Sequence, residues 1–164
     1  MNLNATSHLF WEDKLLVGHA QMDHEHQSFF HLIDALLAAP DKGIALCLDE
    51  VIALATRHFA QEDAWMCKLD FPARQCHMDE HAAVLRSAAG VRLRVHSGDH
   101  RAARLFSQEL AAWFAPHVQH LDSALATWIC KLTWNAKPLV FHRQSRIRAI
   151  TGIAQLPILG VSPC

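Results

Sequence analysis

Apolar positions recur every three or four residues along most of the chain, which is typical of amphipathic helices. Only six glycines and six prolines interrupt the 164 residues. No segment alternates apolar and polar positions with a period of two, so strands are not expected. The long stretches between the breakers predict four helices, over residues 21–38, 41–69, 73–95 and 99–130.

Four amphipathic helices joined by short links predict an all-α fold, an up-down-up-down four-helix bundle. Residues 1–18 precede the first helix and are expected to form a non-helical N-terminal arm. We expect the bundle unit to span residues 1–132. Residues 133–164 form an irregular C-terminal tail that is basic and then apolar. This tail could be disordered, pack on the bundle or bind an acidic partner.

Composition narrows the class of protein. Hydrophobic residues make up 51% of the chain and charged residues 19%, which excludes wholesale disorder and permits a sizeable core. No uncharged apolar run reaches the roughly 18 to 20 residues of a membrane-spanning helix, and the N-terminus does not resemble a signal peptide. The five cysteines include no Cys-x-x-Cys pair, which favours a reducing, cytoplasmic location. We expect neither a membrane span nor a nucleic-acid partner.

Charge is distributed unevenly. Residues 1–122 hold all 16 acidic residues and 10 of the 15 lysines and arginines, a net charge of −6. Residues 123–164 hold five basic residues and no acidic one, a net charge of +5. The chain is therefore predicted to have an acidic body and a basic tail.

Histidine is abundant, with 13 copies against no tyrosine, and several copies lie at ligand-like spacings. The second predicted helix contains His58-x-x-x-Glu62 and the third contains His77-x-x-x-His81. Residues four apart share a helix face, so each pair can reach one metal centre. These two pairs predict a metal site between helices.

The fourth predicted helix contains His117-x-x-x-x-Asp122. Five residues correspond to about 140° around an ideal helix, so these two side chains cannot share a face as neatly as the pairs spaced by four. The spacing suits one histidine ligand and one carboxylate that reaches sideways to a bridge. The first helix adds His26, in Asp23-x-x-His26.

Together the four helices offer five imidazoles and two carboxylates, more than one metal ion needs. Because a carboxylate can bridge two cations, a two-metal site fits this count. Mixed nitrogen and oxygen ligands without thiolate favour iron or zinc over copper(I), magnesium or calcium. The candidate metal ligands are His26, His58, Glu62, His77, His81, His117 and Asp122.

The ordered set of motifs resembles that of the bacterial hemerythrins, over about residues 10–130. The motifs are Trp11-Glu12-Asp13-x-Leu15-x-Val17-Gly18, Met22-Asp23-x-x-His26-x-x-Phe29, His58-Phe59-x-x-Glu62-Asp63-x-x-Met66, His77-x-x-x-His81 and Trp113-x-x-x-His117-x-x-x-x-Asp122.

The resemblance implies a non-haem centre of two iron ions with an oxo or hydroxo bridge. His77, His81 and His117 would hold one iron. His26 and His58 would hold the other, and Glu62 and Asp122 would bridge the two. Dioxygen would bind reversibly at an open position on the second iron, which implies oxygen storage, delivery or buffering and no catalytic residues.

Two alternatives remain at this point. The chain could be a signalling module that senses oxygen or redox state. It could also be a di-iron oxidase, a peroxidase or an enzyme that handles nitric oxide. The enzymes are less favoured because di-iron oxidases typically use carboxylate-rich sites with Glu-x-x-His repeats, which this chain lacks.

Some neighbouring residues have predicted supporting roles. Asp23 and Glu80 could orient ligand imidazoles, although a helix N-cap is the stronger prediction for Asp23. Pro116, which precedes His117, is expected to kink the fourth helix. Six residues are candidates to line a dry oxygen pocket: Phe29, Phe30, Trp65, Trp113, Phe114 and Leu121.

Overall fold

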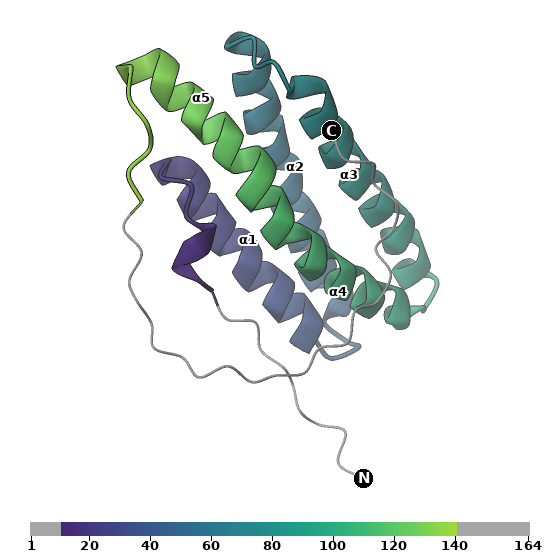
Figure 1. Ribbon diagram of the computed structural model, residues 1–164. Coiled ribbons are helices and arrows are strands. Elements are labelled where there is room, and N and C mark those ends of the chain that lie inside the picture. The colour runs from purple at the N-terminus through teal and green to yellow at the C-terminus, as the bar shows by residue number, and fades with distance from the viewer. Residues whose placement is uncertain (1–10, 141–164) are drawn as a thin grey trace.

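The computed structural model describes residues 11–140 and shows an antiparallel bundle of helices (Figure 1). Its first three helices are α1 (Ala20–Ala38), α2 (Ile44–Lys68) and α3 (Arg74–His96). The fourth rod consists of α4 (His100–His117), a π-helical turn η2 (Val118–Asp122) and α5 (Ser123–Trp134). α1 and α3 each pack against α2 and α4, so the predicted up-down-up-down four-helix bundle is confirmed.

The predicted apolar stripes meet along the axis of the bundle. Phe29, Ile33 and Leu36 on α1 are fully buried, and so are Ile44 and Leu48 on α2. Burial stabilises the fold by about 0.8 kcal/mol for each methylene removed from water, so these stripes hold the helices together. The described part of the chain shows helices, turns and loops, with no strand.

Helices end at the breakers that the sequence supplies. Pro40 and Gly43 separate α1 from α2, and Gly98 lies between α3 and α4 with a φ of +90°. Asp99 then caps α4, because its carboxylate accepts a hydrogen bond from the Ala102 N–H at 3.2 Å. The first three predicted helices match the observed ones to within three residues at each end.

The fourth predicted helix is wrong in one respect, because a π-helical turn interrupts it. Pro116 lies in the last turn of α4, directly before this turn, and cannot donate a backbone hydrogen bond. The extra residue of the π turn rotates the chain that follows. The buried apolar positions of this rod include Phe114, Val118 and Leu125, whereas Leu121 is only partly buried.

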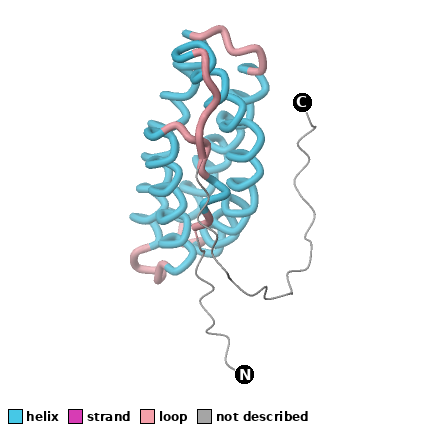
Figure 2. Tube along the Cα trace, turned by 60° about the vertical axis from the view of Figure 1, so that its left-hand side comes forward, coloured by secondary structure: helices cyan, strands magenta, loops and turns pink. Residues whose placement is uncertain are grey.

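The described part of the N-terminal arm lies against the bundle and contains one short 3-10 turn, η1 (Asp13–Leu15). Leu15 and Val17 are buried, and the ring of Trp11 meets the ring of Phe30 edge-on at 5.7 Å. The arm therefore contributes to the core although it is not part of a long helix. Figure 2 draws the loops and turns of the described chain in pink against the cyan helices.

The segment after α5 returns to this arm. Asn135 ends the helix in a left-handed conformation, with its N–H donating to the Lys131 carbonyl at 3.0 Å. At Gly18 an added Cβ would lie 2.7 Å from the Pro138 Cβ, so residues 138–140 pass directly over this glycine. The predicted division at residue 132 stays a prediction; α5 extends to Trp134, and residues 141–164 of the predicted tail lie outside the described residues.

Candidate metal centre

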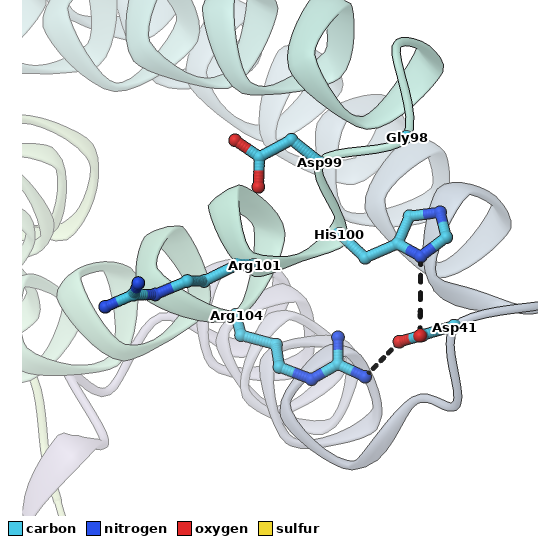
Figure 3. A pocket seen from close by; sticks show the side chains of 6 residues that line it. All are labelled: Asp41, Gly98, Asp99, His100, Arg101 and Arg104. Carbon is cyan, nitrogen blue, oxygen red and sulfur yellow. Dashed lines mark hydrogen bonds and ion pairs between the residues drawn. The ribbon is translucent and has the colours of Figure 1, made fainter.

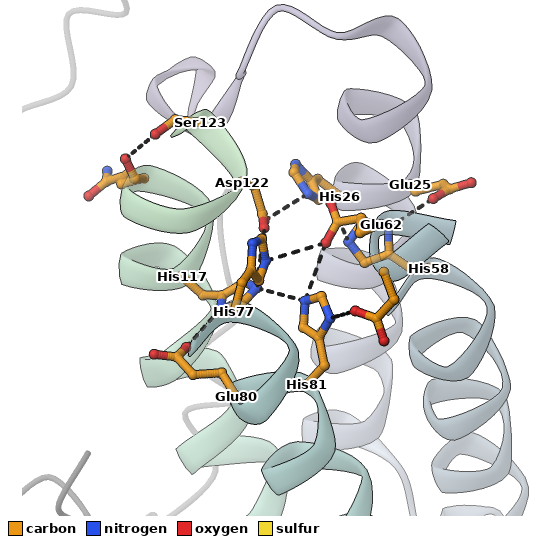
Figure 4. A network of polar contacts seen from close by, with 12 residues as sticks. Glu25, His26, His58, Glu62, His77, Glu80, His81, His117, Asp122 and Ser123 are labelled. Carbon is orange, nitrogen blue, oxygen red and sulfur yellow. Dashed lines mark hydrogen bonds and ion pairs between the residues drawn. The ribbon is translucent and has the colours of Figure 1, made fainter. Parts of the chain in front are cut away.

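All seven predicted ligands converge in the interior of the bundle (Figure 4). Each side chain is buried, with at most 3% of the residue exposed. α1 supplies one of them, α2 and α3 supply two each, α4 supplies one, and the π turn supplies the last. In this order they are His26, His58 and Glu62, His77 and His81, His117, and Asp122.

The ligand atoms form two overlapping groups. In each group the candidate atoms all lie within 4.8 Å of one another. The three-histidine half contains His77, His81 and His117, and the two-histidine half contains His26 and His58. Glu62 and Asp122 belong to both groups.

Asp122 divides its two carboxylate oxygens between the halves. Oδ1 lies 3.0 Å from His77 Nε2 and 3.2 Å from His117 Nε2, in the three-histidine half. Oδ2 lies 3.1 Å from His26 Nε2, in the two-histidine half. This is the arrangement that a carboxylate bridge between two cations requires.

The two carboxylate oxygens of Glu62 are likewise divided between the two halves of the cluster. Its Oε2 lies 3.3 Å from His81 Nε2 and 3.6 Å from His77 Nε2. Its Oε1 lies 3.6 Å from His58 Nε2. Both carboxylates therefore offer one oxygen to each half of the centre.

The π turn explains how Asp122 reaches the centre. A π-helical turn pairs residue i with residue i+5, so residues five apart come to lie on one side of the helix. His117 and Asp122 have this spacing, and η2 connects them. The expectation that the two side chains share a face less neatly assumed an ideal α-helix, and the π turn replaces that geometry. The prediction that Asp122 is a bridging carboxylate stays a prediction, and its two oxygens face the two halves.

Burial and close packing shift the pKa values of the cluster. Burial, together with the nearby Asp122 carboxylate, raises the pKa of Glu62 well above its ordinary value. Burial also opposes ionisation of Asp122, but the His117 imidazolium outweighs it and holds the Asp122 pKa well below its ordinary value. His117 is the counterpart: burial lowers its pKa, yet Asp122 raises it to about 9. Burial lowers the pKa of His81 to about 4.

Several buried polar atoms of the cluster are unsatisfied by the protein itself. Both oxygens of Glu62, both oxygens of Asp122 and Nε2 of His26 have no hydrogen-bond partner among the described residues. Such atoms are costly in a protein interior unless they bind a donor or a cation. Five imidazoles and two carboxylates suit iron or zinc, so these residues fit a two-metal centre.

Three of the ligand imidazoles hydrogen-bond to carboxylates at their outer nitrogen. Nδ1 of His58 lies 2.8 Å from Glu25 Oε2, and Nδ1 of His81 lies 2.8 Å from Asp63 Oδ1. Neither carboxylate was predicted. Each is next in sequence to a ligand, which is the signal that could have identified it, but only the packing shows which imidazole it reaches.

The prediction for Glu80 is confirmed, because its Oε2 lies 2.9 Å from Nδ1 of His117. The prediction for Asp23 is wrong in both forms. Its carboxylate accepts hydrogen bonds from the backbone N–H groups of Val17 and Gly18, at 2.7 and 3.1 Å. The N-cap of α1 is His19, whose Nδ1 accepts from the Met22 N–H.

Several aromatic rings pack directly against the imidazoles of the cluster. Trp113 packs on His117 with ring centroids 4.2 Å apart, and Phe114 meets His26 edge-on at 5.8 Å. Phe29 is buried against Phe114. Sequence reasoning missed Phe59, although it follows a ligand; it stacks on His81 at 4.1 Å.

The remaining candidates for the pocket lining lie further out. Phe30 packs against Trp11 of the arm, and Trp65 packs against His19 at the start of α1. Leu121, on the π turn, is only partly buried. Among the predicted lining residues, Phe29, Trp113 and Phe114 are thus the ones whose rings contact the cluster or its neighbours.

A surface pocket of about 350 Å³ lies at the other end of the bundle and contains no predicted ligand (Figure 3). It lies where the α1–α2 and α3–α4 loops meet. Arg104 there pairs with Asp41 at 2.6 Å, and His100 lies 3.6 Å from the same carboxylate. Its lining residues are Asp41, Gly98, Asp99, His100, Arg101 and Arg104.

The fold is a four-helix bundle, and its interior holds one set of three imidazoles and one set of two, which share two carboxylates. These features define a helical metal-binding protein. Residues 17–129 match the family model described as the hemerythrin HHE cation binding domain. The chain therefore belongs to the hemerythrin family.

Named relatives agree with this assignment. The chain is 38% identical to a bacteriohemerythrin of Ralstonia nicotianae, over 74% of this chain and 88% of the relative. It is 26% identical to a bacteriohemerythrin of Stenotrophomonas maltophilia, over 72% of this chain and 79% of the relative. A hemerythrin-like protein of Naegleria gruberi is 27% identical over half of this chain and 67% of its own length.

Proposed function

We propose that the chain is a non-haem di-iron protein that binds dioxygen reversibly, for storage, delivery or buffering. The observation that carries this proposal is the inequality of the two halves. Three imidazoles face one half and two face the other, while the same two carboxylates serve both. The two-histidine half therefore has one protein ligand fewer and leaves room for a small exogenous ligand.

The side chains of the site would hold the two iron ions and shield them from water. Glu62 and Asp122 span both halves, and the five imidazoles enclose them. Two iron ions bound here would each supply one electron to dioxygen and take it back on release. Phe114 and Phe29 cover the His26 side with apolar rings, which keeps water away from the two-histidine half.

The donor set favours binding over turnover. Di-iron oxidases typically use carboxylate-rich centres built on Glu-x-x-His repeats. This centre instead has five imidazoles and two carboxylates. Within the described residues, the seven predicted ligands and Ser107 are the buried polar side chains. A separate buried acid that could deliver protons to bound oxygen is therefore not found in that part of the chain.

One experiment tests the proposal directly. The protein is loaded with ferrous iron under argon, its iron content is measured, and its visible spectrum is followed through cycles of oxygen and argon. We expect two irons per chain and a visible band that forms with oxygen and is lost under argon. His58→Ala is the matched variant, because it removes one ligand from the two-histidine half only.

Two outcomes would contradict the proposal. A spectrum that changes once and never reverts indicates irreversible oxidation rather than oxygen binding. Sustained consumption of hydrogen peroxide or nitric oxide by catalytic amounts of protein indicates an enzyme.

The cellular location of the protein stays a prediction. Among residues 11–140, no helix is both long enough and apolar enough to cross a membrane. We propose a cytoplasmic location from the cysteine content alone.

A further inference from the structure

Three partly exposed carboxylates connect neighbouring helices through the metal ligands. Glu25 on α1 accepts from Nδ1 of His58 on α2. Asp63 on α2 accepts in the same way from His81 on α3. The series continues with Glu80 on α3 and His117 on α4, so each carboxylate holds a ligand of the next helix along the chain (Figure 4).

The series is unequal between the two halves of the centre. His81 and His117, which have carboxylate partners, both belong to the three-histidine half. In the two-histidine half only His58 has such a partner. Each half also contains one imidazole whose buried Nδ1 has no hydrogen-bond partner among residues 11–140, His77 in the three-histidine half and His26 in the two-histidine half. The three-histidine half therefore has two imidazoles with a carboxylate partner, and the two-histidine half has one.

A carboxylate at Nδ1 has two effects on a ligand imidazole. It keeps the proton on Nδ1, so the Nε2 lone pair is free for the metal, and it fixes the ring orientation. It also makes the imidazole a stronger donor. A half with more of these partners, and with one more imidazole, should bind a metal ion more tightly.

We propose that Glu25, Asp63 and Glu80 are positioning residues that set the order of metal loading. The three-histidine half, supported by Asp63 and Glu80, binds the first ion, and the two-histidine half, supported by Glu25, binds the second. This inference rests on the proposed two-metal function.

Anaerobic titration of the metal-free full-length chain with cobalt(II) tests the order, by visible absorption and calorimetry. The wild type should show two steps of unequal affinity. Glu80→Ala and Asp63→Ala should weaken the first step by about 10- to 100-fold, the usual effect of removing such a partner. Glu25→Ala should weaken the second step by a similar factor and leave the first unchanged.

Matched variants separate this role from a general effect on folding. Asp79→Ala removes the carboxylate beside Glu80 in sequence, which accepts from Gln75 on the surface, and should leave both steps unchanged. Glu80→Gln keeps an acceptor without the charge and should give an intermediate affinity; it replaces Glu80→Ala if that variant does not fold.

The result that overturns the inference is distinct from the result that overturns the function. If the two steps have equal affinity, or if all three alanine variants weaken both steps alike, the order proposed here is wrong although the chain still binds two ions. If the wild type binds fewer than two ions, the proposed di-metal function is itself contradicted.

Discussion

His117 Nε2 lies 3.2 Å from Asp122 Oδ1, although the two residues are five apart in a helical segment. An α-helix would separate them by about 140°, and the π turn between them removes that separation. A local change in helix type thus directs the Asp122 carboxylate, the proposed bridge, toward His117.

Changing the length of this turn should control metal content. An alanine inserted between Gln119 and His120, both exposed, rotates Asp122 by about 100° relative to His117, so metal binding should fall sharply. Deletion of Gln119 leaves three residues between His117 and Asp122, the i, i+4 spacing that places two side chains on one face of an α-helix. The deletion variant should therefore retain more iron than the insertion variant, as measured by elemental analysis. Equal iron in the two variants would falsify this account of the turn.

Removal of single ligands should distinguish the two halves. Glu62 faces both halves, so Glu62→Ala should lose both ions, whereas His58→Ala should retain about one ion per chain in the three-histidine half. Iron quantitation after loading checks both expectations. His24→Ala, an exposed histidine on α1, is the control and should bind two ions like the wild type. Unchanged iron in both ligand variants would rule out the assigned site.

Metal should stabilise the fold. The metal-free bundle buries two carboxylates without satisfying hydrogen bonds from the described residues, which costs free energy of folding. An ion that binds only the folded state adds about 2.7 kcal/mol at a free concentration 100 times its dissociation constant. The melting temperature should therefore be clearly higher with iron than after chelation, as followed by circular dichroism. Equal melting temperatures would contradict the metal-linked fold.

His19 should make stability depend on pH. Its Nδ1 caps α1 by accepting from the Met22 N–H, and burial lowers its pKa from 6.5 despite the nearby Asp23 and Glu25 carboxylates. Because the folded pKa lies below the unfolded one, this contribution is present above pH 6.5 and is lost as pH falls through the folded value. Asparagine keeps a capping acceptor and does not titrate.

The measurement is the melting temperature of the metal-free protein between pH 7 and pH 5. His19→Asn should reduce the fall seen in the wild type, and His24→Asn, on the exposed face of α1, should not. Parallel curves for wild type and His19→Asn would show that the cap does not titrate in this range.

The contact between Gly18 and Pro138 should matter for stability. Gly18 has a φ of +77°, and an added Cβ would lie 2.7 Å from the Pro138 Cβ. Gly98 has a similar φ of +90° but has nothing within 4 Å of such a Cβ. Gly98→Ala should cost about 1 to 3 kcal/mol from backbone strain alone. Gly18→Ala should cost more, measured by urea unfolding, because Pro138 must also move. Equal losses would show that residues 138–140 do not pack on the arm.

The sequence by itself determined the fold class and predicted the seven residues that meet in the interior of the bundle. Helical periodicity and the placement of proline and glycine are local signals, so they predicted the first three helices and their ends. Spacings of four at His58 and Glu62, and at His77 and His81, fix a shared helix face wherever the helices pack.

Only the tertiary structure decided how these ligands are divided and aimed. Backbone hydrogen bonding selected a π turn after Pro116, which no apolar pattern signals, and this turn brought Asp122 beside His117. Contacts between different helices paired Glu25 with His58 and Asp63 with His81. Such pairings depend on the relative rotation and height of two packed helices, and the spacing of residues within either helix carries no information about that relation.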